Sequence, residues 1–218
     1  MSAMPGNPPP TVVLGVDPGT HVLGWGVVSA QGPRLVALGY GVVRAPATAP
    51  VDRRLLVLAA GLREVVARFK PSEAAIEEVF FGRDARAAVR IGEGRGAALV
   101  VLAEAGVAVS GYTNNVVKRA VTGAGRAGKE RVRTMVRAIL GLTSLSGPLD
   151  ASDALALAVC RHHARGAPGA AGTARDADAS PSTGLRASPA GRYAPRVEAA
   201  VRAMRAKEAA RHAARAAR

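Results

Sequence analysis

Residues 11–20 read TVVLGVDPGT, and this stretch decides the fold. Its first six residues form an almost unbroken apolar and largely β-branched run, which is typical of a strand that is buried on both faces of a sheet. The run ends in the carboxylate of Asp17, and Pro18-Gly19 then supplies turn chemistry. The stretch therefore predicts a central strand that carries one acidic side chain to the edge of a sheet.

The rest of the chain alternates between strand and helix patterns. Strand-like segments at 24–30 and 34–44 are separated by Gln31-Gly32-Pro33, which predicts a hairpin and an antiparallel meander of the first three strands. Helical spacing of apolar residues over Val51–Phe69 ends before Pro71. We expect further strands at 74–80 and 107–112, and further helices at 85–105, 116–121, 129–140 and 150–163. This order predicts an α/β domain, built on a mixed five-stranded sheet flanked by helices.

Four carboxylates lie where these elements begin or end. Right-handed crossovers bring the ends of the first and fourth strands side by side, and so place Asp17 near the Glu77-Glu78 pair. Asp150 and Asp153 open the last helix three residues apart, on one helix face. Converging carboxylates repel one another, so such a cluster is useful mainly with a cation that prefers oxygen ligands, such as Mg²⁺. Four acids suit two ions about 4 Å apart that flank a phosphodiester.

Each acid also has a plainer interpretation. Asp-Pro-Gly is ordinary turn chemistry, and it also occurs in sugar kinases and actin-like ATPases. Strand alternation sends Glu77 and Glu78 to opposite faces without choosing between them. Asp150 is also a suitable N-cap, and Asp153 a suitable first-turn acid for the helix dipole. The adjacent His162-His163, about three turns further on, fits a frayed helix end better than a pair of ligands.

The chain is strongly basic, with a net charge of +14, which suits a nucleic-acid partner. Arg and Ala are enriched together, so part of this charge reflects general composition. A basic cluster surrounds a glycine-rich segment at 123–128 and can bind phosphate; a solvated loop is the alternative. Its members are Lys118, Arg119, Arg126, Lys129 and Arg131. Phe80 directly follows the acidic strand end, where an exposed ring can stack on bases; core packing is the alternative.

Composition predicts three parts. Residues 1–10, with three consecutive prolines, are expected to be a disordered leader, and residues 11–165 the folded domain. Residues 166–218 are rich in Ala, Gly, Pro, Ser and Arg and are expected to be a disordered basic tail, with a marginal helix over Arg196–Arg218. The single cysteine excludes an internal disulfide. The longest apolar stretch, 97–109, is too short to span a bilayer, so we expect a cytoplasmic protein with no membrane partner.

In this order the motifs resemble the RuvC family of Holliday junction resolvases, the crossover junction endodeoxyribonucleases. The resemblance covers about residues 12–163 and rests on Leu14–Gly19, Ala75–Phe80, Arg95-Gly96, Val117–Lys129 and Asp150–Ala156. It implies an RNase H-like fold and a homodimer that resolves four-way junction DNA by paired, metal-dependent nicks during homologous recombination and DNA repair. It also implies the branch-migration proteins RuvA and RuvB as partners.

Residue by residue, the resemblance implies catalytic and metal-binding roles for Asp17, Glu77, Asp150 and Asp153. It selects Glu77 over Glu78 and implies two Mg²⁺ ions per site, for which Mn²⁺ could substitute. Lys118 and Lys129 match basic residues near the scissile phosphate, and Phe80 matches an aromatic residue that engages unpaired bases. The chain departs from the family pattern at Asn114-Asn115, where a proline-containing turn is common, and at Gly128, where a polar residue is common.

Three other functions stay open at this point. A YqgF-like nuclease of the RNase H fold, acting on RNA or another nucleic acid, would share most of these motifs. An ATPase of the sugar-kinase and actin type would need a second phosphate motif and a duplicated domain, for which the chain is too short. A non-catalytic DNA-binding protein would not need the four acids.

Overall fold

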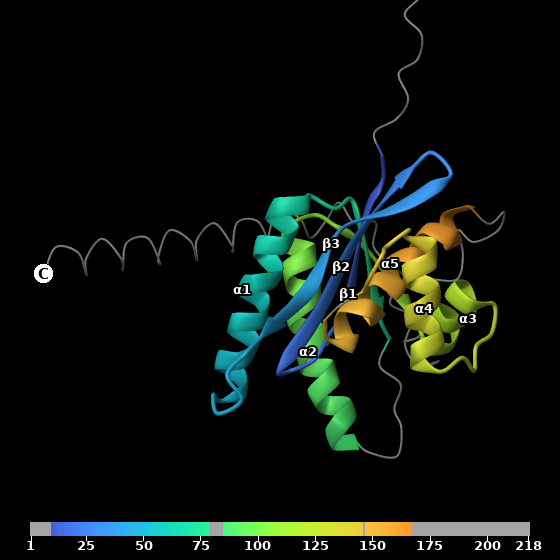
Figure 1. Cartoon of the computed structure of the whole chain (residues 1–218). Helices are drawn as coiled ribbons and strands as arrows, with labels where there is room; N and C mark the ends of the chain where they lie inside the picture. The colour runs from blue at the N-terminus through green and yellow to red at the C-terminus, as the bar shows by residue number, and fades with distance from the viewer. Residues whose placement is uncertain (1–9, 79–84, 146, 167–218) are drawn as a thin grey trace, which may run out of the picture. The chain divides into compact units, whose positions relative to one another are not determined.

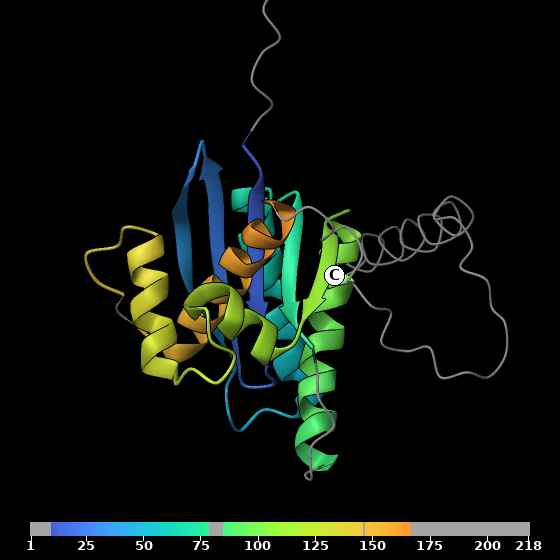
Figure 2. The same cartoon turned by 90° about the vertical axis from the view of Figure 1, so that its right-hand side faces the viewer.

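The computed structural model describes residues 10–78, 85–145 and 147–166 (Figure 1). Within these ranges the chain forms one sheet with helices on both of its faces (Figure 1, Figure 2). The elements in chain order are β1 (Val12–Asp17), β2 (Val22–Gln31), β3 (Arg34–Arg44), α1 (Val51–Phe69), β4 (Glu73–Glu77), α2 (Ala85–Glu104), β5 (Ala108–Tyr112), α3 (Asn114–Thr122), α4 (Lys129–Ile139) and α5 (Leu149–Gly166).

The sheet is five-stranded and mixed, in the order β3-β2-β1-β4-β5. Strands β1, β2 and β3 form the predicted antiparallel meander, whereas β4 pairs parallel with β1 and β5 pairs parallel with β4. The register of the central pair aligns Val16 with Ile76. Asp17 and Glu77, the next residue on each strand, therefore leave the sheet at the same edge, as the sequence predicted.

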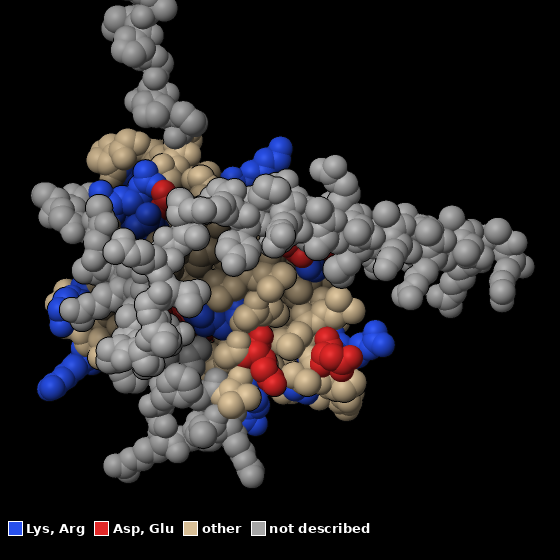
Figure 3. All heavy atoms as spheres, turned by 180° about the vertical axis from the view of Figure 1, so that it is seen from behind, with Lys and Arg blue, Asp and Glu red and all other residues tan. Residues whose placement is uncertain are grey.

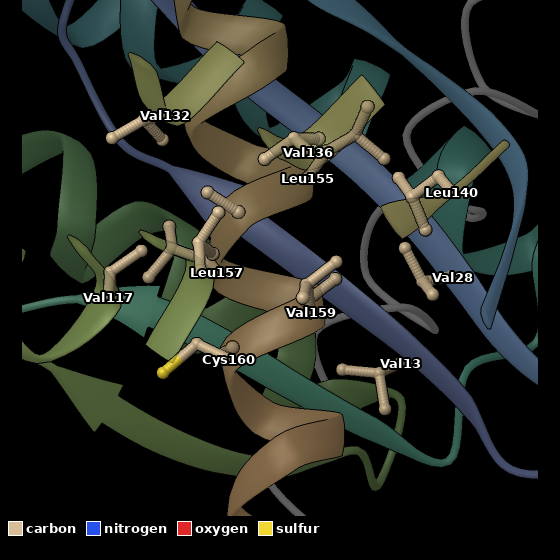
Figure 4. Packing of buried hydrophobic residues seen from close by; sticks show 14 of the residues in the cluster. Val13, Val28, Val117, Val132, Val136, Leu140, Leu155, Leu157, Val159 and Cys160 are labelled. Atoms are coloured by element: carbon tan, nitrogen blue, oxygen red, sulfur yellow. The ribbon is translucent and has the colours of Figure 1, made fainter. Parts of the chain in front are cut away.

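Both faces of β1 are buried, which explains its unbroken apolar run. Val13 belongs to a core under α3, α4 and α5 that also contains Leu155 and Val159 of α5 (Figure 4). Leu14 and Val16 belong to a second core under α1 and α2. All three β1 side chains are fully buried. Alternate residues of one strand thus anchor the two helical layers, and the strand end is held from both sides.

Helix α5 lies directly on the backbone of β1 and β2, because glycines form the surface beneath it. A Cβ added at Gly15 would lie 1.8 Å from the Ala154 carbonyl oxygen, and one at Gly24 would lie 2.2 Å from the Asp150 carbonyl oxygen. Gly24 is also the cross-strand partner of Asp17. Any side chain at Gly24 would therefore push the start of α5 away from the end of β1.

The far end of α5 is also fixed. Arg161 and Arg165 both pair with Glu73 at the start of β4, the former with a 2.7 Å contact between Nε and Oε2. His162 is buried and its Nε2 lies 3.1 Å from the Val28 carbonyl oxygen, so this nitrogen carries the proton and donates. The interpretation of His162-His163 as a frayed end is therefore wrong, because the Nδ1 of His163 also bonds, to the Ala120 carbonyl oxygen.

Two element boundaries differ from the prediction. The strand expected over 74–80 ends at Glu77. Its partner strand β5 ends at Tyr112, whose carbonyl accepts a last hydrogen bond from the Glu78 N–H, so no β5 backbone remains for later residues to pair with. The helix expected at 116–121 begins at Asn114, because the Thr113 carbonyl accepts bonds from the next turn. The leader at 1–9, Phe80 and the tail at 167–218 lie outside the described residues. None of the described helices is long and apolar enough to cross a membrane.

Candidate functional site

The structure brings the four predicted carboxylates to one end of the sheet. Asp17 and Glu77 end neighbouring parallel strands, and Asp150 and Asp153 lie in the first turns of α5. Burial raises the pKa of Asp17 from 3.8 to about 7, and repulsion from the other three carboxylates adds to this rise. All three predicted partners of Asp17 thus act on its pKa. We call these four residues the acidic cluster.

Lys129 supplies the opposing charge. Its Nζ lies 3.7 Å from Oδ2 of Asp153. Burial raises the pKa of Asp153, and the nearby Lys129 ammonium acts against that rise. The same ammonium also acts against the rise in the pKa of Asp17. In the protein alone, part of the negative charge of the cluster is therefore balanced by one lysine.

A small hollow of about 50 Å³ opens beside the cluster. Its lining combines acids, lysines, one amide and an apolar floor: Glu77, Asp153, Lys118, Lys129, Asn114, Val117, Val132 and Leu157. Two acids that suit a cation thus share one hollow with two ammonium groups that suit a phosphate. This is the arrangement expected where a metal-bound phosphodiester is to be held.

Geometry separates Glu77 from Glu78, which strand alternation could not do. The Glu77 side chain lines the hollow, and the Asn114 Nδ2 donates a hydrogen bond of 3.4 Å to its Oε1. The Arg95 Nε donates a 3.3 Å bond to the backbone carbonyl of Glu77. Glu78 lies instead over β5, where a Cβ added at Gly111 would come within 2.6 Å of its Oε1. The structure therefore favours Glu77 as the acid of the site.

The turn after Asp17 is held by two helices. Arg54 of α1 donates from Nε to the Thr20 carbonyl oxygen at 3.1 Å. Gly94 of α2 lies so close that an added Cβ would stand 2.3 Å from the Gly19 carbonyl oxygen. The Asp17 side chain thus projects from a backbone that is fixed on both sides.

The residues predicted to bind nucleic acid do not all lie at the hollow. Lys118 and Lys129 line the hollow. Arg119 is exposed on α3 and does not line it. Phe80 lies outside the described residues. Seen from behind, the molecule carries Lys and Arg side chains at several separate places, so the basic charge is not confined to this hollow (Figure 3).

The donor set fits a hard divalent cation by its chemistry, since carboxylate oxygens are the ligands that Mg²⁺ prefers. The unneutralised repulsion at Asp17 points the same way. Within the described ranges, however, no three Asp, Glu, His or Cys side chains stand close enough to hold a metal as they are placed. Binding an ion therefore requires the carboxylates to draw together, a movement that Lys129 at Asp153 would have to permit.

Sequence reasoning missed several residues that shape this site. Asn114 holds the Glu77 side chain, although the sequence marked it only as a departure from a family pattern. Arg95 holds the Glu77 backbone carbonyl, although the sequence marked it only as part of a family motif. Gly24 and Gly94 let α5 and α2 approach the acids. Alternating glycines within a predicted strand, as in Gly24-Trp25-Gly26, are a usable signal for such a close backbone approach.

Comparison with known proteins agrees with this geometry. The family model described as crossover junction endodeoxyribonuclease RuvC matches residues 13–162. The crossover junction endodeoxyribonuclease RuvC of Chloroflexus aggregans is 46% identical over 155 residues, 71% of this chain and 93% of that protein. The corresponding protein of Heliobacterium modesticaldum is 43% identical over 152 residues, 70% of this chain and 94% of that protein.

Solved structures give the same picture. The RuvC structure of Thermus thermophilus has a TM-score of 0.66 at 40% identity, covering 71% of this chain and 95% of that one. T. thermophilus RuvC in complex with Holliday junction substrate has a TM-score of 0.67 at 40% identity, with coverage of 71% and 94%. The yeast mitochondrial Holliday junction resolvase Ydc2, with a TM-score of 0.53, is only 10% identical over 70% of this chain and 78% of that one, and so shares the fold alone. These likenesses confirm the predicted RNase H-like fold.

Proposed function

Because the chain belongs to the RuvC family of crossover junction endodeoxyribonucleases, we propose that its acidic cluster is the catalytic, metal-binding site of a Holliday junction resolvase. The enzyme hydrolyses phosphodiester bonds, and its function is to resolve Holliday junctions by metal-dependent nicks in recombination and repair. The prediction of a resolvase is confirmed over the alternative of a YqgF-like nuclease. The identity of the metal, the role of each residue and the partners are the parts that we propose.

The observation that carries the site is the meeting of the four acids at one end of the sheet, where burial and the other three carboxylates raise the pKa of Asp17. Mg²⁺ is the proposed metal, with two ions per site and Mn²⁺ as a substitute. Asp17, Glu77, Asp150 and Asp153 would hold the ions, which would supply an activated water for attack on phosphorus and stabilise the negative charge on the leaving 3′ oxygen. The protein fixes the acids: α5 is seated on Gly15 and Gly24, and Glu77 is held by Asn114 and Arg95.

Lys118 and Lys129 are proposed to bind the scissile phosphate, because both ammonium groups share the hollow with Glu77 and Asp153. Arg119 follows Lys118 directly and is exposed, and it is proposed to contact a more distant phosphate of the same DNA. Phe80 is proposed to engage unpaired bases at the junction centre, on the strength of the family resemblance. Binding that depends on these contacts should weaken steeply as salt rises, because each phosphate contact releases counterions.

A homodimer is proposed, with α2 as the contact. Two symmetric cuts need two sites related by a twofold axis. Val89 and Val100 are 59% and 55% exposed, although both are apolar. Gly92 and Gly96 lie between them at helical spacing, and a Cβ added at either would meet nothing within 4 Å. This face of α2 carries the exposed Glu93 as well as the two valines, and its glycines leave it open and flat enough for a second α2 to approach closely.

The dimer is tested by analytical ultracentrifugation of the full chain and of Val100→Glu. Val100→Glu should shift the protein to monomer, because a charge would be buried at the contact. Val116→Glu, the same change at an exposed valine of α3, serves as the control. A wild-type monomer at micromolar concentration would contradict the dimer, and a Val100→Glu dimer would contradict this interface. RuvA, RuvB and a cytoplasmic location complete the proposal, because they are the partners and the compartment that a junction-resolving enzyme of this family implies.

The function is tested with a synthetic four-way junction, purified full-length protein and Mg²⁺, with Asp17→Asn as the variant. Strand-specific labels should reveal paired, symmetric nicks in the wild type. The variant should bind the junction without nicking it. Loss of junction binding together with nicking would show that Asp17 supports the fold or the DNA contact, and would contradict its proposed role. Equal cutting of duplex and junction would contradict the structural specificity.

A further inference from the structure

The ion pair of Lys129 with Asp153 joins a proposed phosphate-binding residue to a proposed metal ligand. The two side chains stand 3.7 Å apart from Nζ to Oδ2. They belong to different helices, α4 and α5, and so the contact is tertiary. While its ammonium group pairs with Asp153, Lys129 occupies the place that a metal would take there, and it is not free to bind the phosphate as proposed.

The charges around the cluster explain why Lys129 is drawn there. Three carboxylates face Asp17 from β4 and α5, and Lys129 is the cation that opposes them. At Asp153 the opposing cations are Lys129 first and Lys118 after it. The ammonium thus stands within the negative potential of the acidic cluster, as a divalent ion would.

The Lys129 side chain is free to move. It is 64% exposed, compared with 34% for Asp153, so little packing holds it at the carboxylate. Lys129 is the first residue of α4, and Gly128 before it has no neighbour within 4 Å of an added Cβ. A lysine carries its charge on a flexible stem with several rotatable bonds, and can therefore change partner without moving the helix.

We propose that Lys129 is the resident counter-ion of the metal-free acidic cluster, and that metal binding displaces it from Asp153 toward the phosphate. This inference rests on the proposed function, because it takes Asp153 as a metal ligand. It assigns Lys129 two effects of opposite sign. The ammonium weakens metal binding, by pairing with a ligand and repelling the ion, and it strengthens phosphate binding.

Removing the Lys129 charge should therefore raise metal affinity while it lowers nicking activity. Lys129→Gln should tighten Mn²⁺ binding about three- to tenfold, because the ion no longer has to displace an ammonium group. The same variant should nick junctions more slowly, since a phosphate contact is lost. Lys129→Arg keeps the charge and should leave Mn²⁺ affinity within about twofold of the wild type.

Lys118→Gln is the matched control. Lys118 lines the same hollow and carries the same charge, but its influence on Asp153 is the smallest of those that act on that residue. This variant should also nick slowly, yet it should change Mn²⁺ affinity by less than about twofold. The two lysines are therefore separated by metal affinity and not by activity.

The experiment is calorimetric titration of Mn²⁺ into the full-length protein without DNA, with circular dichroism to verify folding. Asp17→Asn defines the site-specific component, which is the binding lost in that variant. Tighter binding in Lys129→Gln, with Lys118→Gln unchanged, is the expected result. Unchanged or weaker binding in Lys129→Gln would overturn the counter-ion inference, and so would an equal gain in Lys118→Gln. Binding that Asp17→Asn leaves intact would instead overturn the proposed metal site.

Discussion

Replacing Asp17 by Asn should make the metal-free protein more stable while it abolishes nicking. Asp17 is the residue of the acidic cluster whose carboxylate is most strongly disfavoured by its surroundings, since burial and three other acids raise its pKa to about 7. The negative charge of Asp17, which the proposed metal would need, therefore lowers the free energy of unfolding when no metal is bound. An uncharged amide of the same size removes that penalty and keeps the shape.

The magnitude follows from proton linkage. The pKa of Asp17 is raised from 3.8 in the unfolded chain to about 7 in the fold, so between these values the folded state binds more protons. The contribution of Asp17 to folding stability is consequently most favourable below about pH 4, falls as pH rises through this window, and bears the full penalty above about pH 7. A shift of about 3 units at about 1.4 kcal/mol each gives about 4 kcal/mol, which local relaxation reduces to about 2–4 kcal/mol.

Urea unfolding of the full chain in EDTA measures this effect. At pH 8, Asp17→Asn should exceed the wild type by about 2–4 kcal/mol, which corresponds to about 5–15 °C in Tm for a domain of this size. At pH 5 the gain should fall below about 2 kcal/mol, because the wild-type carboxyl is then mostly protonated in the fold. Added Mg²⁺ should stabilise the wild type and leave the variant unchanged.

Asp52→Asn is the matched control, because Asp52 has a side chain that is 72% exposed at the start of α1 and is not among the charges that shift the pKa of Asp17. It should change stability by no more than about 0.5 kcal/mol. An Asp17→Asn variant that is less stable than the wild type at pH 8 would refute the reasoning. A gain of equal size at pH 5 and pH 8 would refute it as well, since the effect would then not come from ionisation.

Three further predictions concern residues that hold the site. Asn114→Ala should weaken Mn²⁺ binding about three- to tenfold in calorimetry, because Glu77 loses its amide donor. Asn115→Ala is the control and should leave the affinity unchanged, because Asn115 is an exposed neighbour without that contact. Gly24→Ala should destabilise the fold by about 1–3 kcal/mol in urea and should also lower metal affinity, because its Cβ would displace the start of α5; intact affinity would show that α5 tolerates the shift. Burial lowers the pKa of His162, so the unfolded chain binds more protons below about pH 6.5 and wild-type stability should fall more steeply toward pH 5 than that of His162→Gln; parallel curves for the two proteins would contradict this.

Local sequence patterns sufficed for the elements and for the chemical class of the site. β3 (Arg34–Arg44) and α1 (Val51–Phe69) have the predicted bounds, because a hairpin turn and an apolar helical period are recorded in neighbouring residues. The two pairs of acids were recognisable for the same reason, since each stands at the end of an element whose pattern is local. The crossover rule then placed Asp17 beside Glu77, and the pairing of β1 with β4 agrees.

Only the tertiary structure decided how these acids are held and balanced. Strand alternation could not choose between Glu77 and Glu78, because the choice depends on what lies against each side chain: the hollow and Asn114 on one side, β5 on the other. The pairing of Lys129 with Asp153 joins two helices, and its existence depends on how closely α4 and α5 pack. Periodicity reports which face of an element is buried, whereas charge balance depends on distances of a few ångströms between residues far apart in the chain, and those distances exist only after the helices have packed on the sheet.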